Sequence, residues 1–379
     1  MTSGQVPAPG GSMWAAEIVV TPELAAELIR EQFAALASAA VTLLETGWDN
    51  TAFVVDGQWL FRFPRRQIAL PGVQREIDVL PMLAPRLPLP IPDPVFVGQP
   101  TEHYAWPFFG ARLLPGRELA ASGLSEAARR PAAAGIGGFL RALHDPDLVP
   151  LVAGAGLPVD PMRRASPPAR ARKAREVLAM LARRGLRPAS SEMSCLLDQA
   201  EAEPPAAGPP AAGPPRAGPP RAGPLRAGPP ARGTAQARAR PDAGPAGQAA
   251  APGHAAVAAS PVTAGDADDP GDGSLVVSHG DLHVRHLLVE AGAATGVIDW
   301  GDLCLADPAV DLSIAYLGFA GAARAELLAA YGRPVTARRE LAARTCAVSI
   351  GTALAEYAAA EDRRALLAES LAALHRAVS

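Results

Sequence analysis

The alternation of short apolar runs with polar clusters is most informative between residues 276 and 319. An apolar pair at 276–277 predicts a short buried strand that leads into the polar sequence H-G-D. Two further apolar runs, 287–289 and 297–298, flank a glycine turn and predict a hairpin whose second strand ends on Asp299. Because a hairpin brings its two ends together, we expect the H-G-D segment and Asp299 to lie side by side.

The N-terminal part of the chain predicts several strands and two helices. Thr21 suits a helix N-cap and Pro22 the first helical position, so an amphipathic helix is expected over 21–33. Apolar spacing predicts a second helix over 73–83. Asp56-Gly57 between two apolar runs is typical of a hairpin turn. Strands are expected at 41–44, 52–55, 59–63, 95–97 and 105–114.

From about residue 126 the pattern becomes helical. Apolar residues recur with a spacing of 3.6 until a proline ends the helix just after His144, and we expect His144 to pack in the core. The arginines of the stretch 167–184 predict a solvated helix face rather than a nucleic-acid contact. Further helices are expected at 322–331, 336–357 and 362–377.

Two segments are predicted from their composition to have no packed structure. Residues 1–20 are rich in Gly, Pro and Ser and predict a loose tail. The segment 204–273 contains a five-residue Pro-Gly-Ala repeat with almost no larger apolar side chain, which predicts a disordered insertion. A period of five excludes collagen. Its role stays open between binding a partner and a neutral expansion.

Composition narrows the class of protein. At 379 residues the chain accommodates one large or two moderate domains, and a net charge of −3 gives no broad attraction to nucleic acid or anionic membrane. The three cysteines are scattered and predict neither a disulfide framework nor a metal knuckle. No signal peptide or membrane helix is expected. These features predict a cytoplasmic protein.

The candidate chemistry lies on Asp281, His286 and Asp299. One carboxylate can take a proton from a hydroxyl while an imidazole and a second carboxylate hold a cation beside it, as phosphoryl transfer requires. In the alternative interpretation, the histidines at 279, 283 and 286 are packing or surface residues and Asp299 is a turn residue. His283 and His286 also have a spacing compatible with zinc, although no cysteine lies nearby at finger spacing.

The pattern H-G-D-x-x-x-x-H, followed by I-D-W and then by D-P and D-L at 307–312, resembles the aminoglycoside and macrolide phosphotransferases. These enzymes are small-molecule relatives of protein kinases. The resemblance implies an α+β, protein-kinase-like fold of two lobes, the N-terminal one small and β-rich and the C-terminal one larger and mainly helical. The implied parts are a flexible tail (1–20), a small nucleotide-binding lobe (21–107), the first part of the large lobe (108–203), the insertion (204–273), and the catalytic loop, metal loop and substrate helices (274–379).

The resemblance also implies roles for the three candidate residues. Asp281 would orient and deprotonate the acceptor hydroxyl, and His286 and Asp299 would hold Mg²⁺. Most kinase-like enzymes have asparagine where this chain has His286, whereas macrolide phosphotransferases have histidine, which favours a macrolide-type acceptor over an aminoglycoside. Asp311, at the start of a helix, is expected to brace the catalytic loop.

The nucleotide site is implied by four further residues. Arg62 in F-R-F-P-R stands where the family's phosphate-contacting lysine is expected, and Glu76 is the acid placed to pair with it. Trp106 and Phe108 fall at the hinge that receives the nucleotide base. The turn over the phosphates contains only one glycine, Gly47, where protein kinases have several.

The implied function is transfer of the γ-phosphoryl group of ATP or GTP to a hydroxyl of a small molecule, such as an aminoglycoside- or macrolide-like antibiotic, with a role in resistance. No nucleic-acid or membrane partner is expected. Two alternatives stay open: a kinase of an endogenous small alcohol, and a nucleotide-binding pseudokinase that regulates a partner. On the C-terminal helices, Glu356, Glu361 and Asp362 are either contacts for the amino groups of an antibiotic or ordinary surface acids.

Overall fold

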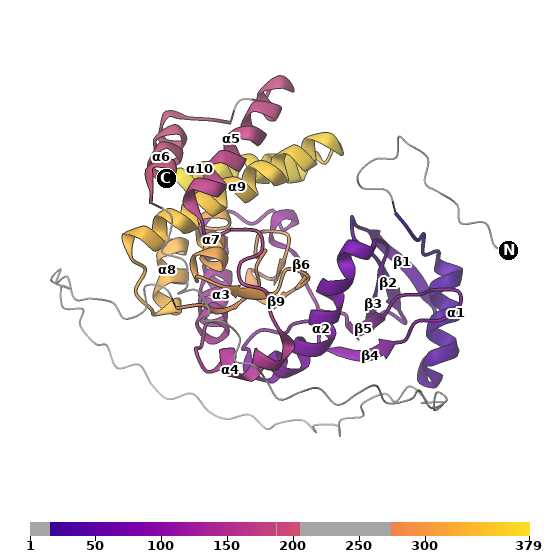
Figure 1. Cartoon of the computed structure of the whole chain (residues 1–379). Coiled ribbons are helices and arrows are strands. Elements are labelled where there is room, and N and C mark those ends of the chain that lie inside the picture. The colour runs from indigo at the N-terminus through magenta and orange to yellow at the C-terminus, as the bar shows by residue number, and fades with distance from the viewer. Residues whose placement is uncertain (1–15, 187, 205–273) are drawn as a thin grey trace, which may run out of the picture.

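The computed structural model of the chain describes residues 16–186, 188–204 and 274–379. Most of the predicted tail and nearly all of the predicted insertion therefore lie outside the described residues. Figure 1 shows two lobes: a smaller one of strands β1 to β5 with helices α1 and α2, and a larger, mainly helical one that holds the C-terminus.

The small lobe is built on an antiparallel sheet of five strands in the order β1-β2-β3-β5-β4. Asp56 and Gly57, which join β2 to β3, have φ angles of +50° and +65°, as a tight hairpin turn of this kind requires. The expected strands are all present. Their bounds are Val41–Thr46 (β1), Asn50–Val55 (β2), Trp59–Pro64 (β3), Pro94–Gly98 (β4) and Phe108–Arg112 (β5).

The two helices of the small lobe, α1 (Pro22–Gln32) and α2 (Leu70–Leu83), cover opposite faces of the sheet (Figure 1). Successive side chains of a strand point to opposite faces. On β3, Phe61 and Phe63 therefore enter the core beneath α1, whereas Arg62 between them points to the face covered by α2. Because of this alternation, the guanidinium of Arg62 lies on the side of the sheet that faces the large lobe.

The sheet extends the small lobe beyond the boundary predicted at residue 107. Strand β5 pairs with both β3 and β4, so the lobe continues to Arg112. Phe108 enters the core beneath α1 and Phe109 the smaller cluster beneath α2. The predicted boundary at residue 107 divides the apolar run 105–114 between two lobes. In the structure, the β5 part of this run is an inner strand of the small-lobe sheet.

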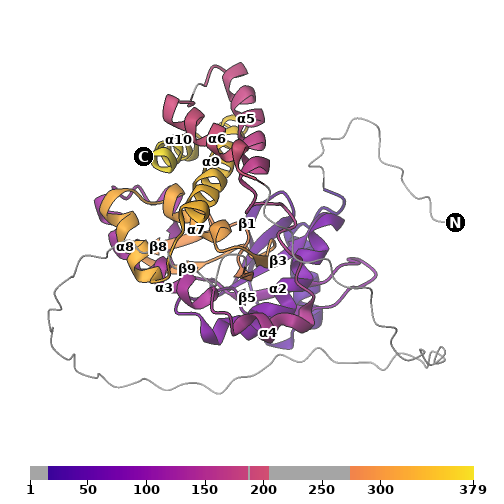
Figure 2. The same ribbon diagram turned by 60° about the vertical axis from the view of Figure 1, so that its left-hand side comes forward.

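The large lobe contains eight α-helices within the described residues. Helix α9 contacts α5, α7 and α10, and α3 packs against α8 (Figure 2). Helices α4 and α6 are additional to those predicted from the sequence, and every residue of α7 is buried. The bounds are Arg130–Leu143 (α3), Leu148–Val152 (α4), Pro167–Arg183 (α5), Ser191–Ala202 (α6), Ala309–Leu317 (α7), Gly321–Tyr331 (α8), Ala337–Ala360 (α9) and Arg364–Val378 (α10).

Two small sheets lie between these helices and the small lobe. Strands β8 (Leu287–Glu290) and β9 (Ala293–Val297) form the predicted hairpin, and β6 (Arg117–Glu118) pairs with β8. Strand β7 (Val276–Ser278) pairs with β10 (Cys304–Ala306), a strand not predicted from the sequence. Among the helices of the described residues, none is both long and apolar enough to cross a membrane.

Candidate active site

The loop between β7 and β8 runs from His279 to His286 and contains the central candidate residues. Gly280 in this loop has a φ of +88°, and a Cβ atom there would lie 2.1 Å from the carbonyl oxygen of Asp302. Only glycine tolerates both the conformation and the close approach. The loop therefore lies directly against the segment that follows Asp299.

Asp311, at the start of α7, braces this loop as the sequence predicted. Its buried carboxylate accepts hydrogen bonds from the backbone N–H groups of His279 (2.8 Å) and Gly280 (3.0 Å). Nε2 of His144 lies 3.2 Å from the same carboxylate. Burial raises the pKa of Asp311, but the hydrogen bond and charge of His144 outweigh burial and hold the pKa below its usual value. An ionised carboxylate thus anchors the loop backbone.

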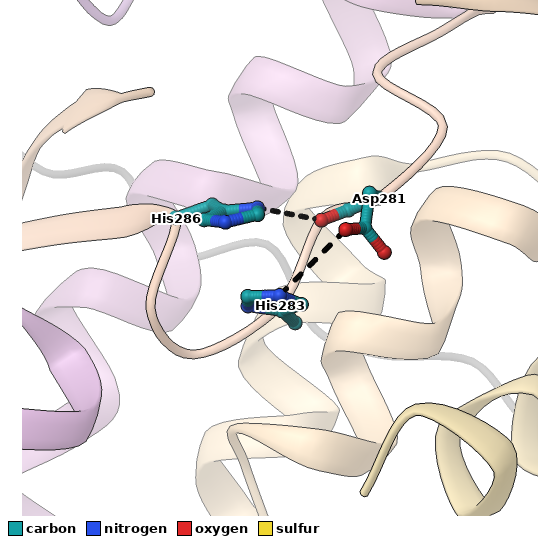
Figure 3. Close-up of side chains that lie close together, drawn as sticks. All are labelled: Asp281, His283 and His286. Carbon is teal, nitrogen blue, oxygen red and sulfur yellow. Dashed lines mark hydrogen bonds and ion pairs between the residues drawn. The ribbon is translucent and has the colours of Figure 1, made fainter. Parts of the chain in front are cut away.

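The side chain of Asp281 is 26% exposed. Its Oδ1 atom pairs with Nη2 of Arg164 at 3.0 Å, and its Oδ2 atom lies 3.8 Å from Nε2 of His283. Figure 3 shows the imidazole of His283 facing this carboxylate from the same loop. A partly exposed carboxylate with one oxygen held in place can accept a hydrogen bond from a substrate hydroxyl on its other oxygen.

His286 is oriented by the backbone of the same loop. Its Nδ1 atom lies 2.8 Å from the carbonyl oxygen of Asp281 (Figure 3), which accepts the Nδ1 proton, and its Nε2 atom lies 3.3 Å from the Asp299 carboxylate. The protonated ring donates from Nε2 to Asp299, whereas the neutral ring has its lone pair on Nε2. Burial lowers the pKa of His286, but the hydrogen bond and charge of Asp299 outweigh burial and raise the pKa above its usual value.

Asp299 follows β9 with a φ of +65° and shares its carboxylate between the two lobes. One oxygen contacts His286 of the large lobe, and Oδ1 accepts from Nη2 of Arg62 of the small lobe at 2.8 Å. The partial loss of water around the carboxylate raises its pKa, but Arg62 and His286 outweigh this and hold the pKa well below its usual value. Asp299 is therefore ionised near neutral pH.

Arg62 has a second, more buried partner in Glu76 of α2. Nη1 of Arg62 lies 2.6 Å from Oε1 of Glu76, which also accepts the backbone N–H of Trp300 at 3.2 Å. Burial raises the pKa of Glu76 to about 7, since the charge of Arg62 offsets only part of the lost hydration. Burial lowers the pKa of Arg62, and the two carboxylates outweigh this and raise it, so the guanidinium stays charged.

The donor set of Asp299 and His286 fits a divalent cation. The Asp299 carboxylate is ionised and its side chain is 47% exposed, and the Nδ1 contact of His286 leaves Nε2 as the coordinating nitrogen of the neutral ring. A carboxylate oxygen suits hard cations, and an imidazole nitrogen suits softer ones such as Mn²⁺ or Zn²⁺ better than Mg²⁺.

A zinc site formed by His283 and His286 is less compatible with the geometry. Potential ligand atoms of Asp281, His283 and His286 lie within 4.8 Å of one another. However, the two imidazole rings are stacked, with centroids 3.7 Å apart and planes 30° apart. Imidazole binds metal through a lone pair in its ring plane, so stacked rings direct their lone pairs side by side rather than onto one point. The geometry favours the pair of His286 and Asp299.

Of the predicted hinge residues, Phe108 begins β5 and Trp106 lies two positions before it. The side chain of Phe108 is buried and stacks on Phe63 with centroids 4.4 Å apart, so only its main chain is available to a nucleotide base. Trp106 packs edge-on against Tyr104. The hinge assignment of Trp106 and Phe108 stays a prediction.

The acids proposed for an antibiotic's amino groups lie at the end of α9 and just beyond it. Glu356 pairs with Arg184 at 3.4 Å, whereas Glu361 and Asp362 are exposed. Tyr357, beside Glu356, contacts Trp48 of the small lobe edge-to-face at 5.1 Å between centroids. The end of α9 therefore approaches the β1–β2 turn.

Sequence patterns missed three residues of the site. Arg164 and Asp302 pair at 2.9 Å beside Asp281, and His144 bridges Asp311 and the hydroxyl of Tyr331. Asp302 had a local signal, because it follows Asp299 by three positions. Arg164 and His144 had none, since their partners lie more than a hundred positions away along the chain.

Comparison with known proteins gives a family match. The model of the phosphotransferase enzyme family matches residues 40–344. No curated protein sequence matches the chain significantly.

Solved structures with a similar fold include the GDP complex of wild-type aminoglycoside 2'-phosphotransferase-IIIa, with a TM-score of 0.56, 17% identity, and coverage of 95% of this chain and 99% of that one. The GDP and kanamycin complex of APH(2")-IIia gives a TM-score of 0.54 at 18% identity, covering 93% of this chain and 97% of that one. Macrolide 2'-phosphotransferase MphH from Brachybacterium faecium gives a TM-score of 0.46 at 22% identity, covering 88% and 91%. The first two matches confirm the predicted α+β, protein-kinase-like fold of two lobes.

Proposed function

Because this chain belongs to the phosphotransferase enzyme family, we propose that it transfers the γ-phosphoryl group of ATP or GTP to a hydroxyl of an aminoglycoside- or macrolide-like antibiotic. One observation supports this most strongly. Asp281, His286 and Asp299 meet in one cluster, and Asp299 is held by the cation of the small lobe, Arg62. In the proposed roles they are a base, two cation ligands and a phosphate-binding cation, which are groups that phosphoryl transfer uses.

Asp281 orients the attacking hydroxyl. The hydroxyl donates a hydrogen bond to the Asp281 carboxylate, and its oxygen forms a bond to the γ-phosphorus as the bond to the β-phosphate oxygen breaks. The nucleoside diphosphate leaves with the electron pair of that bond, and the hydroxyl proton passes to Asp281. Such a base contributes about 10²–10⁴-fold to the rate.

Arg62 and Glu76 prepare the nucleotide site. Glu76 fixes one nitrogen of the guanidinium from the buried side, while the second nitrogen contacts the half-exposed Asp299 carboxylate. A phosphate oxygen can approach Arg62 at this more exposed side, because the planar fork of arginine binds anions bidentately.

The family implies a divalent cation, and we propose Mg²⁺ held by Asp299 and His286. When bound, it neutralises charge on the phosphate oxygens. We also propose a cytoplasmic location, where the nucleotide is abundant; the chain's three cysteines are all free.

Two features support an antibiotic acceptor. The chain has a histidine at 286, as the macrolide phosphotransferases it resembles do, and a similarly folded enzyme is described in complex with GDP and kanamycin. Both kinds of antibiotic have hydroxyl groups beside basic amines. An endogenous small alcohol is the second candidate acceptor, and a pseudokinase role is the alternative without turnover.

The test is a panel of kanamycin, erythromycin and small endogenous alcohols, each incubated with the full chain, Mg²⁺, and ATP or GTP. Mass spectrometry measures the gain of one phosphoryl group on the acceptor. We expect one antibiotic to be modified, and Asp281→Asn to lower the rate of product formation by about 10²–10⁴-fold while still binding nucleotide. Modification of the alcohols alone would replace the antibiotic by an endogenous acceptor. Nucleotide binding without any phosphorylated product would overturn the proposed function in favour of a pseudokinase.

A further inference from the structure

Arg164 approaches the catalytic loop from a different part of the chain. It lies in the connection between α4 and α5, and its side chain is only 13% exposed. Its guanidinium makes three contacts: Nη2 with Oδ1 of Asp281 at 3.0 Å, and Nη1 with Oδ2 of Asp302 at 2.9 Å and the carbonyl oxygen of Gly280 at 2.6 Å. One side chain thus joins the catalytic loop to the segment after Asp299.

The backbone that holds Arg164 is itself fixed. Both oxygens of Asp160 accept backbone N–H groups, Oδ1 from Arg164 at 2.7 Å and Oδ2 from Ala165 at 2.9 Å. The same connection is bonded to β10, because Leu305 donates to Pro158 and accepts from Asp160, both at 2.9 Å. Strand β10 pairs with β7, which leads into the catalytic loop. The segments that contain Arg164 and Asp281 are therefore both attached to the sheet of β7 and β10.

The charged groups paired with the guanidinium of Arg164 are two carboxylates. Two carboxylates, Asp281 and Asp302, face one guanidinium. Burial lowers the pKa of Arg164, but the two carboxylates outweigh burial and raise the pKa above its usual value. The cation is therefore permanent, and its planar shape fixes the directions of its contacts.

A carboxylate that acts as a base needs one oxygen directed at the hydroxyl. Asp281 turns freely about its terminal bond unless one oxygen is held, since such torsions are broad. Arg164 holds Oδ1, and Oδ2 faces the opposite side, towards His283 (Figure 3). We propose that Arg164 is a positioning residue for phosphoryl transfer, which holds Oδ1 of Asp281 and thereby presents Oδ2 to the acceptor hydroxyl.

This inference rests on the proposed function, which makes Asp281 the base. It predicts that Arg164 acts on the rate through Asp281 and not on nucleotide binding. If Arg164 only stabilised the fold, its substitution would lower the free energy of unfolding. It would then also lower kcat by the same factor whether or not Asp281 is present. The two possibilities are separated by a double-mutant cycle, because residues that act as a unit give non-additive effects.

The experiment compares four chains: wild type, Arg164→Ala, Asp281→Asn and the double variant. The probe is kanamycin or erythromycin, whichever the wild type phosphorylates faster. We expect Arg164→Ala to lower kcat by about 10–100-fold with KM for nucleotide changed less than about threefold, since a small misplacement of a reacting group costs up to about 10²-fold. In the Asp281→Asn background the same substitution should change kcat by less than about twofold.

Two further variants keep the test decisive. Arg163→Ala removes the exposed neighbouring arginine and should leave kcat unchanged. Asp302→Asn keeps the shape of one anchor of Arg164 and should lower kcat by about 3–10-fold, a smaller change than Arg164→Ala, because Gly280 still holds the guanidinium. Guanidinium ion at a non-denaturing concentration should restore part of the kcat of Arg164→Ala, because it can enter the space left beside Asp281.

An unchanged or increased kcat in Arg164→Ala would overturn the inference while leaving the proposed function intact. An equal loss in the wild-type and Asp281→Asn backgrounds would also overturn it, because the effect would not pass through Asp281. If Arg164→Ala does not fold, the inference is decided by Asp302→Asn, and an unchanged kcat there overturns it. If the wild type phosphorylates an alcohol of the panel instead of an antibiotic, the same four chains are compared with that alcohol. If it phosphorylates no acceptor, the proposed function and this inference are overturned together.

Discussion

Asp311 is the residue whose substitution should damage both the fold and the rate. In Asp311→Ala, the buried backbone N–H groups of His279 and Gly280 lose their acceptor, and the ring of His144 loses its partner. Each unsatisfied buried donor costs about 1–3 kcal/mol. Because some water can enter the space left by the carboxylate, we expect the free energy of unfolding to fall by about 3–5 kcal/mol, a large part of the total for a typical protein.

The rate should fall with stability because Gly280 precedes Asp281. A loop without its anchor displaces the base, and a displacement of about 1 Å costs on the order of 10²-fold in kcat. Asp311→Asn should lie between Ala and wild type, since one amide oxygen still accepts one of the two N–H groups.

The measurements are denaturant unfolding and kcat at a temperature where each variant is folded. Asp198→Ala is the matched control: its side chain is 73% exposed and pairs with the partly exposed Arg175, so its cost should stay below about 1 kcal/mol. A loss below about 1 kcal/mol in Asp311→Ala, or a loss equal to that of the control, would refute the reasoning.

The pH dependence adds a second check on Asp311. Its folded pKa lies below the usual value, so its stabilisation is complete above the unfolded pKa of about 3.9 and is lost as pH falls through the folded pKa. The difference between wild type and Asp311→Ala should therefore be constant from pH 8 to about pH 5 and shrink only below about pH 4. A difference that already shrank between pH 8 and pH 5 would contradict this assignment.

Three further predictions concern the other groups of the site. Asp281→Asn should lower kcat by about 10²–10⁴-fold with little change in the Kd for nucleotide, measured by titration; equal loss of folding would make it a structural residue. His286 binds a cation only when neutral and its pKa is raised, so the Mg²⁺ concentration for half-maximal rate should rise between about pH 7.5 and pH 6, and His286→Asn should flatten that rise; identical profiles would exclude His286 as a ligand. Arg62→Lys should raise KM for nucleotide by about tenfold, because an ammonium group cannot hold Glu76 and Asp299 in separate directions as the guanidinium does; an unchanged KM would exclude that role.

Local sequence signals were sufficient for the parts of the site that lie at strand ends. The β8–β9 hairpin brings His286 and Asp299 together because its turn and its apolar runs are consecutive in the chain. Strand alternation also separates Arg62 from Phe61 and Phe63 and directs it to the face where it contacts Glu76. In both cases the physical cause is contained in fewer than about fifteen consecutive residues.

Contacts between distant segments were not predictable in this way. Strand β10 is short and its pairing with β7 is decided by tertiary packing, so its three residues gave no strand signal. The same holds for His144, which was expected only to pack: it is buried, but a polar contact with Asp311 accounts for its position. The boundary at residue 107 failed for a related reason, since only the pairing of β5 shows to which lobe the run belongs.

The contacts of α2 suggest how the small lobe is coupled to Asp299. A Cβ atom at Gly72 of α2 would lie 2.8 Å from the carbonyl oxygen of Gly301, and Arg75 donates to that same carbonyl at 2.7 Å. Helix α2 therefore rests on the backbone that follows Asp299. The Glu76 contact of Arg62 lies within the small lobe and is almost fully buried, whereas its Asp299 contact crosses to the large lobe and is half-exposed. When an anionic phosphate reaches Arg62, the crossing contact is the one that can exchange, because water and ligand have access to it. Glu76 would then keep the guanidinium in place while the Asp299 carboxylate is released to its other partner, His286, so that binding of an anion at Arg62 and release of Asp299 from Arg62 would occur together.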